Sequence, residues 1–134
     1  MAPMLHFGQG KAMEYHSHGL EVTQEAVALY AEVTDDFNPI HLDPDFAMKT
    51  AMGGVIAHGT LSLGLVWDVL SRVPGFDGAH AALDIRFVRP VRLGNTVRAG
   101  ARATESGGLE VWVENERGEL VIAGSATVRP GEQQ

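Results

Sequence analysis

A carboxylate and an imidazole, Asp36 and His41, stand five positions apart on either side of a proline. Pro39 fixes its own φ and pushes Asn38 out of the helical region, so a helix before it must end here in a rigid bend. A carboxylate and a histidine that reach the same water form a minimal pair for acid–base catalysis. The alternative is a structural turn that Asp36 caps, with His41 an ordinary polar residue of a helix–loop junction. These residues alone do not separate the two interpretations.

A second group of residues, His58-Gly59-Thr60, precedes the most apolar predicted helix. The first N–H groups of a helix have no intrahelical acceptor, and the helix dipole is positive there. Because Gly59 has no side chain, an oxygen atom can approach its N–H closely, as in an oxyanion hole. The alternative is that Gly59 only permits tight packing and that His58 caps the helix. Ser62 has no obvious acid–histidine partner, so the sequence does not indicate a serine nucleophile.

Composition narrows the class of protein. The chain has 134 residues, 45% hydrophobic residues, a net charge of −7 and no cysteine. An acidic chain is a poor partner for nucleic acid, and without cysteine there are no disulfides, thiolate nucleophiles or thiolate metal ligands. His16 and His18 share one face of a predicted strand but have no third ligand at a fixed spacing, so we expect no metal site.

The same composition bears on localisation. The N-terminal residues lack the apolar core of a signal peptide. The most apolar stretch, residues 53–70, carries His58 and Asp68, which argues against membrane insertion. We therefore expect one soluble, cytoplasmic domain over residues 1–134, with a flexible tail at 130–134.

Helix and strand signals follow one another along the chain. Residues 11–20 resemble a strand, and Thr23 is a candidate N-cap for a helix that ends near Thr34. Asp43-Pro44 is a helix start, with a short helix expected over 46–50. The longest helix is expected over 60–73, followed by strands over 81–88, 96–104, 109–114 and 120–128.

Short turns between these last strands require antiparallel neighbours. A strongly curved antiparallel sheet around one long helix buries that helix economically, which predicts an α+β fold of the hot-dog kind. Such a layout leaves an edge strand and an apolar flank exposed, so we expect a homodimer or a higher homo-oligomer.

The chain also resembles a known family. The stretch 36–44, Asp-Phe-Asn-Pro-Ile-His-Leu-Asp-Pro, is similar to the hydratase-2 motif of the MaoC-like dehydratases, which include the (R)-specific enoyl-CoA hydratases. The likeness continues through residues 46–47, 52–59, 87–91 and 94–97, and so runs in order across most of the chain. One departure is Asp35, because many members have glycine before the catalytic aspartate. Aspartate adopts left-handed backbone geometry more readily than most residues.

The resemblance implies a reversible syn addition of water to a trans-2-enoyl thioester, giving the (R)-3-hydroxyacyl product. By this resemblance Asp36 and His41 match the catalytic pair, Gly59 matches the backbone donor to the thioester carbonyl, and Asn38 matches the residue that braces the turn. We expect the substrate to contact five residues: Asn38, His58, Thr60, Arg86 and Arg89. No cofactor is expected apart from coenzyme A as part of the substrate.

Three alternatives remain open at this point. The thioester handle is either coenzyme A or an acyl carrier protein, and arginines such as Arg86 and Arg89 could contact either one. The alternative for each of these arginines is a solvated sheet face that balances the seventeen acidic residues. After the coenzyme A and carrier-protein substrates, the third alternative is a non-catalytic subunit that binds acyl thioesters. Such a subunit would need no acid–base pair. A hot-dog thioesterase is a weaker option.

Overall fold

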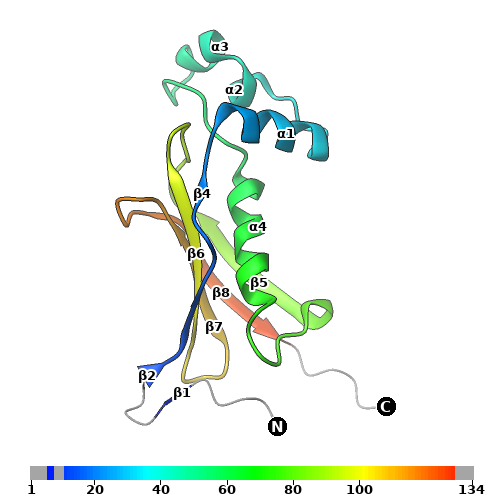
Figure 1. Cartoon of the computed structure of the whole chain (residues 1–134), viewed down its shortest axis with the longest axis vertical. Coiled ribbons are helices and arrows are strands. Elements are labelled where there is room, and N and C mark those ends of the chain that lie inside the picture. The colour runs from blue at the N-terminus through cyan, green and yellow to red at the C-terminus, as the bar shows by residue number, and fades with distance from the viewer. Residues whose placement is uncertain (1–5, 8–10, 129–134) are drawn as a thin grey trace.

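The protein is an antiparallel sheet wrapped along one central helix (Figure 1). The computed structural model describes residues 6–7 and 11–128. The strand order is β3-β6-β7-β8-β5, and β4 also pairs with β6. These strands are β3 (Glu14–His16), β4 (Leu20–Glu21), β5 (Ala81–Phe87), β6 (Thr96–Ala103), β7 (Leu109–Glu114) and β8 (Leu120–Val128). A separate pair consists of β1 (His6–Phe7) and β2 (Lys11–Ala12).

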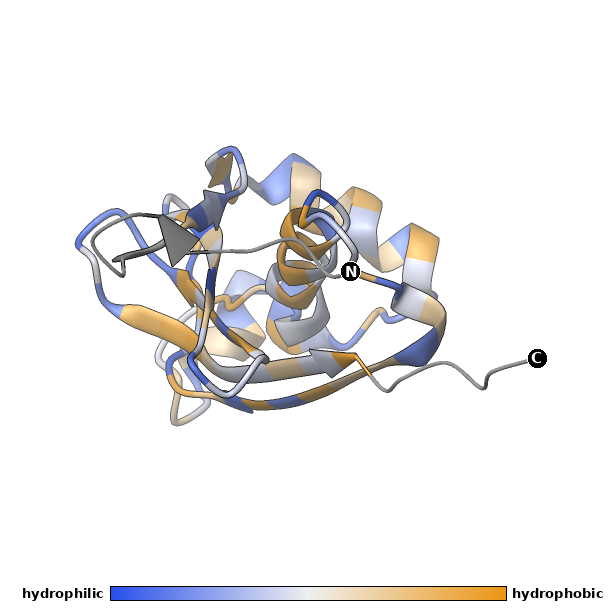
Figure 2. Ribbon diagram, turned by 90° about the horizontal axis from the view of Figure 1, so that it is seen from below, coloured by the Kyte–Doolittle hydropathy of each residue, from blue (hydrophilic) through white to orange (hydrophobic). Residues whose placement is uncertain are grey.

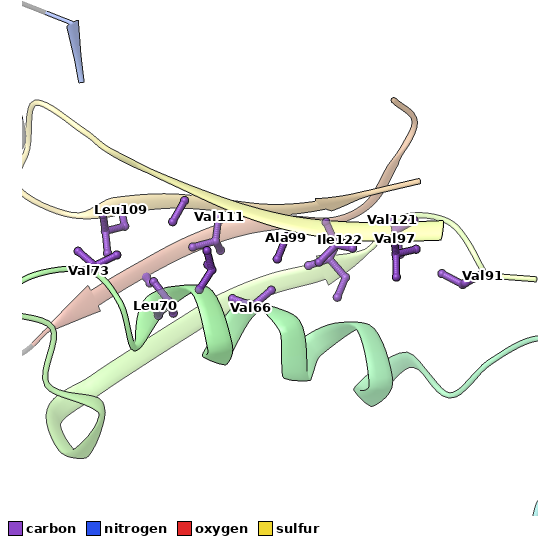
Figure 3. Packing of buried hydrophobic residues seen from close by; sticks show 14 of the residues in the cluster. Val66, Leu70, Val73, Val91, Val97, Ala99, Leu109, Val111, Val121 and Ile122 are labelled. Atoms are coloured by element: carbon purple, nitrogen blue, oxygen red, sulfur yellow. The ribbon is translucent and has the colours of Figure 1, made fainter. Parts of the chain in front are cut away.

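The core lies between the sheet and helix α4 (Gly59–Leu70). Along strands β6 and β7, side chains on the buried face alternate with side chains on the outer face, as a sheet with one buried face requires. Val97 and Ala99 point toward the helix, while Arg98 lies on the outer face. Figure 3 shows Val66 and Leu70 of α4 packed against these inward-facing residues. The expected hot-dog arrangement is therefore confirmed, and seen along the molecule the strands curve around a largely hydrophobic α4 (Figure 2).

Three short helices form a layer at the end of the molecule where α4 begins (Figure 1). They are α1 (Gln24–Thr34), α2 (Pro39–Leu42) and α3 (Pro44–Met48). The expected caps are present, because the Thr23 hydroxyl accepts from the Ala26 N–H and the Asp43 carboxylate accepts from the first N–H groups of α3. The bend predicted at Pro39, between Asp36 and His41, lies in this layer.

The structure corrects several expected boundaries. The strand expected over 11–20 is divided into β2, β3 and β4. The ladder with β6 is interrupted between β3 and β4, where the Ser17 hydroxyl takes the place of a backbone acceptor for the Ala99 N–H. Helix α3 begins at Pro44, the predicted first helical position, and ends at Met48 rather than at residue 50. Helix α4 ends at Leu70, and a short 3-10 helix (Gly78–His80) that the sequence did not predict precedes β5. The tail at 130–134 lies outside the described residues.

Over the described parts of the chain, none of the helices has the length and hydropathy needed to cross a membrane. Of the apolar stretch 53–70, residues 59–70 form α4.

An ion-pair network on the outer face of the sheet gives a first testable prediction. Arg102 donates to Glu14 (Nε–Oε2 2.8 Å) and to Glu110 (Nη1–Oε1 2.7 Å), which ties β3 to β6 and β7. The hydrogen bond from Arg102 holds the pKa of Glu14 below its ordinary value of 4.5. A carboxylate with a lowered folded-state pKa contributes stability above its unfolded pKa, and this contribution disappears as the pH falls through the folded value.

We therefore expect Glu14→Gln to lower the free energy of unfolding at pH 7 by less than about 1 kcal/mol, since the pair is exposed. The difference from the wild type should shrink steadily as the pH falls below 4.5. Urea unfolding at a series of pH values measures both quantities. A difference that grows toward low pH would contradict this role for Glu14.

Candidate active site

The C-terminus of α1 turns sharply and presents Asp36. Asp35 adopts the left-handed conformation (φ 57°, ψ 35°) and its N–H bonds to the carbonyl of Ala31. The Asp36 N–H bonds to the same carbonyl at 3.1 Å. This is the helix-terminating geometry in which glycine is usual. Asp35 therefore adopts a backbone conformation that costs energy for any residue but glycine.

This geometry predicts that Asp35→Gly stabilises the fold. We expect the free energy of unfolding to rise by about 0.5–1 kcal/mol, because the strained left-handed residue loses its Cβ. Thermal unfolding of the two proteins under identical conditions tests this expectation. A lower melting temperature for Asp35→Gly would mean that the aspartate side chain, and not the backbone, stabilises the turn.

Asn38 braces the bend between Asp36 and His41. Its side-chain oxygen accepts from the Ile40 N–H at 3.1 Å and caps α2, while its own N–H donates to Asp36 Oδ1 at 3.3 Å. The bend is more regular than expected, because Pro39 opens the short helix α2 and does not merely stiffen a loop. The structure thus shows how the motif fixes the Asp36 side chain, while contact of Asn38 with a substrate stays a prediction.

His41 is held in one ring orientation and one tautomer. Its Nδ1 lies 2.7 Å from the carbonyl oxygen of Ile56. A carbonyl oxygen can only accept, so Nδ1 carries the hydrogen and Nε2 is left to exchange protons. His41 is half-buried, and Asp36 is exposed. The fold therefore holds the imidazole and leaves its reactive nitrogen free.

His58 is buried beneath these two residues. Its Nε2 lies 2.9 Å from the Asp36 carbonyl oxygen, and its ring stacks on the His41 ring with centroids 3.8 Å apart. Side-chain nitrogen or oxygen atoms of Asp36, His41 and His58 all lie within 4.8 Å of one another. Two groups at this separation can share one water, since each hydrogen bond to it spans about 3 Å. Contrary to the alternative from the sequence, the His58 side chain makes no capping hydrogen bond to α4.

Gly59 is the first residue of α4, where its N–H has no acceptor within the helix. A cavity of about 360 Å³ opens beside it, between the start of α4 and the segment 87–91. His58, Gly59 and Arg89 line this cavity, whereas Asp36 and His41 do not. The site therefore has two adjoining parts, the Asp36–His41 pair and the cavity at Gly59, with His58 between them.

The remaining predicted residues lie at different places around this site. The Thr60 hydroxyl accepts a hydrogen bond from Tyr30 at 2.7 Å. Arg89 donates to the Leu120 carbonyl at 2.9 Å, next to the cavity. Arg86 lies on the exposed side of β5 and does not line the cavity. Contact of these side chains with a substrate stays a prediction.

Three residues that the sequence reasoning missed also belong to this region. Tyr30 of α1 packs edge-on against His58, with ring centroids 5.0 Å apart, and holds Thr60. Ser62 and Phe87 line the cavity. The spacing of Ser62, three residues after Gly59 on the same helix, was a usable signal because such residues share a face. Phe87 lies in the stretch 87–91 that resembles the family, whereas Tyr30 comes from a distant helix and had no such signal.

A metal ion would have few free ligands in this cluster. His41 Nδ1 and His58 Nε2 are already bonded to backbone carbonyls. The expectation of no metal remains a prediction that this geometry supports.

Together these residues define an acid–base site beside a backbone donor on a hot-dog fold. The chain matches the model of the MaoC-like domain over residues 9–123 and belongs to this family. The resemblance noted in the sequence is thus confirmed, and the family places the protein among the hydro-lyases.

Individual relatives agree with this assignment. The chain is 34% identical to the (R)-specific enoyl-CoA hydratase of Rhodospirillum rubrum over 113 residues, which cover 80% of this chain and 78% of that protein. It is 38% identical to the 3-hydroxybutyryl-CoA dehydratase of Methylorubrum extorquens over 86 residues, or 63% of this chain and about half (55%) of that protein. The structure of the (R)-hydratase from A. caviae involved in PHA biosynthesis superimposes with a TM-score of 0.71 at 25% identity, covering 89% and 96% of the two chains.

Proposed function

We propose that the protein catalyses the reversible syn hydration of trans-2-enoyl-CoA to (R)-3-hydroxyacyl-CoA. The observation that carries this proposal is the convergence of Asp36 and His41 within 4.8 Å, beside the free N–H at the start of α4. The names of the relatives support it, because they include an (R)-specific enoyl-CoA hydratase and a 3-hydroxybutyryl-CoA dehydratase.

In the hydration direction a water lies between Asp36 and His41. The Asp36 carboxylate accepts one proton of this water as its oxygen bonds to C3 of the enoyl group. The protonated Nε2 of His41 donates a proton to C2, and the proton on Asp36 then returns to His41 through solvent. Water is thus added across one double bond, and the reverse sequence dehydrates the product.

The thioester oxygen gains negative charge as the water attacks C3. The Gly59 N–H and the positive end of the α4 dipole are placed to stabilise this charge. Gly59 lines the cavity, so a thioester carbonyl bound there can reach the N–H. This requires no metal and no cofactor besides coenzyme A as part of the substrate.

The second candidate is the same reaction on a 3-hydroxyacyl thioester of a carrier protein. Both handles carry phosphate, which a guanidinium binds well, and the exposed Arg89 lines the cavity, whereas Arg86 is exposed on β5 and does not line it. Steady-state assays with crotonyl-CoA and with the crotonyl carrier-protein thioester decide between them. A higher kcat/KM with crotonyl-CoA supports the first candidate, and activity only with the carrier protein supports the second. Binding without turnover of either compound would instead indicate a non-catalytic subunit.

We also propose that the protein acts as a homodimer in the cytoplasm. Strand β5 is at the edge of the sheet, and Phe87 and Val88 at its end are about half exposed, at 56% and 49%. An edge strand with exposed apolar side chains is usually covered. Light scattering of the purified protein should give twice the mass of the chain, and the mass of a single chain would contradict the dimer.

A further inference from the structure

The short segment 56–59 holds every part of the proposed reaction centre. The Ile56 carbonyl fixes the His41 ring, and the His58 side chain bonds to the Asp36 backbone. Gly59 supplies the N–H at the start of α4. The segment itself is tied to the rest of the fold, since the Ala57 N–H bonds to the Val91 carbonyl at 2.8 Å. The position of the α1–α2 bend relative to α4 therefore depends on contacts with these few residues.

His58 makes the connection to Asp36. Because the Asp36 carbonyl can only accept, Nε2 of His58 carries the hydrogen, and Nδ1 must be an acceptor. Nδ1 is buried and has no hydrogen-bond partner among the residues that the structure describes. A buried acceptor without a partner is unfavourable, so an apolar side chain would serve simple packing better. The ring is thus retained for its other contacts, the donated hydrogen bond and the stacking on His41.

We propose that His58 is a positioning residue of the reaction centre. Its Nε2–H holds the Asp36 backbone at 2.9 Å, and its ring supports the ring of His41 with centroids 3.8 Å apart. His58 thereby sets the separation between the base and the acid without exchanging a proton itself. This inference rests on the proposed function; contact of His58 with substrate at the cavity that it lines stays a separate prediction. Small displacements of reacting groups can cost about 100-fold in rate, so the expected effect is measurable.

Two substitutions separate the contacts of His58. His58→Phe keeps a ring that can stack on His41 but removes the donor to Asp36. His58→Gln keeps an N–H donor near the position of Nε2 but removes the ring. We expect His58→Phe to lower kcat about 10- to 100-fold with KM changed less than about threefold, and His58→Gln to recover part of this loss.

The deciding experiment is a double-mutant cycle with Asp36→Asn. If His58 acts through Asp36, His58→Phe should lower the residual kcat of Asp36→Asn by less than about threefold. Equal fold losses in both backgrounds, or a raised KM with unchanged kcat, would overturn the positioning role. Circular dichroism and melting temperatures identify a variant that fails to fold, and if His58→Phe fails to fold, the spectra of the wild type and of His58→Gln decide.

A spectroscopic measurement keeps this inference separate from the proposed function. Long-range ¹H–¹⁵N spectra of the wild type should show His58 protonated at Nε2 and His41 protonated at Nδ1, and the His41 signals should shift in His58→Gln. This outcome supports the positioning geometry even if no enoyl thioester is turned over. A His58 ring protonated at Nδ1, or unchanged His41 signals, would contradict it.

Discussion

Asp36→Asn and His41→Ala are each expected to reduce kcat at least ~100-fold, the usual contribution of a positioned acid or base. Asparagine cannot accept a proton from water, but its side-chain oxygen can still accept from the Asn38 N–H that now bonds Asp36 Oδ1. Asp36→Asn should therefore lose the base that accepts the proton and keep the hydrogen bond that stabilises the turn. His41→Ala removes both Nε2 and the hydrogen bond to Ile56, so its stability must be measured as well.

Matched controls exist for both substitutions. Asp45 is an exposed carboxylate in the first turn of α3, and His18 is an exposed imidazole far from the bend in the sequence. Asp45→Asn and His18→Ala should keep kcat within about twofold of the wild type. Near-normal turnover of Asp36→Asn or His41→Ala in a folded protein would exclude the proposed acid–base pair.

The second large effect is expected for Gly59→Ala. A Cβ at this position would lie 2.9 Å from the Phe87 ring, at a residue that lines the cavity. Phe87 is about half exposed and can move aside, so the fold should survive. The approach of the thioester oxygen is then hindered, and we expect kcat/KM to fall at least ~10-fold, approaching the ~100-fold cost of losing an oxyanion donor.

Gly64 provides the control on the same helix. A Cβ added there meets no atom within 4 Å. Gly64→Ala should stabilise the protein by about 0.5–1 kcal/mol, because alanine is the better helix former, and should leave kcat/KM unchanged. If both alanine substitutions leave kcat/KM unchanged, the start of α4 does not bind the thioester oxygen.

Much of the fold could be predicted from local signals. Strands β7 and β8 lie where β-rich runs of sheet length predicted them, and Thr23 and Asp43 cap the helices that follow them. The predicted strand boundaries were wrong where a side chain replaces a backbone hydrogen-bond acceptor. Ser17 is such a residue, and it interrupts the first predicted strand. Such a replacement depends on a residue of β6 that is distant in the sequence, so periodicity alone cannot reveal it.

The sequence predicted which residues form the candidate site but not how these residues are arranged in space. The Pro39 bend correctly indicated that Asp36 and His41 lie close together. The stacking of His58 on His41 depends on how the segment before α4 passes beneath the α1–α2 bend, which no local pattern encodes. The contact of Tyr30 with His58 and the position of Phe87 at the cavity likewise depend on tertiary packing.

The most direct test of the account is the stereochemistry of hydration. Crotonyl-CoA is incubated with the purified protein in D₂O, and the product is analysed by NMR and chiral chromatography. Because Asp36 and His41 act from one side of the substrate, deuterium at C2 and hydroxyl at C3 should be added to the same face, with R configuration at C3. An anti product, an S product, a mixture of diastereomers, or no consumption of either coenzyme A or carrier-protein enoyl thioesters would contradict the account.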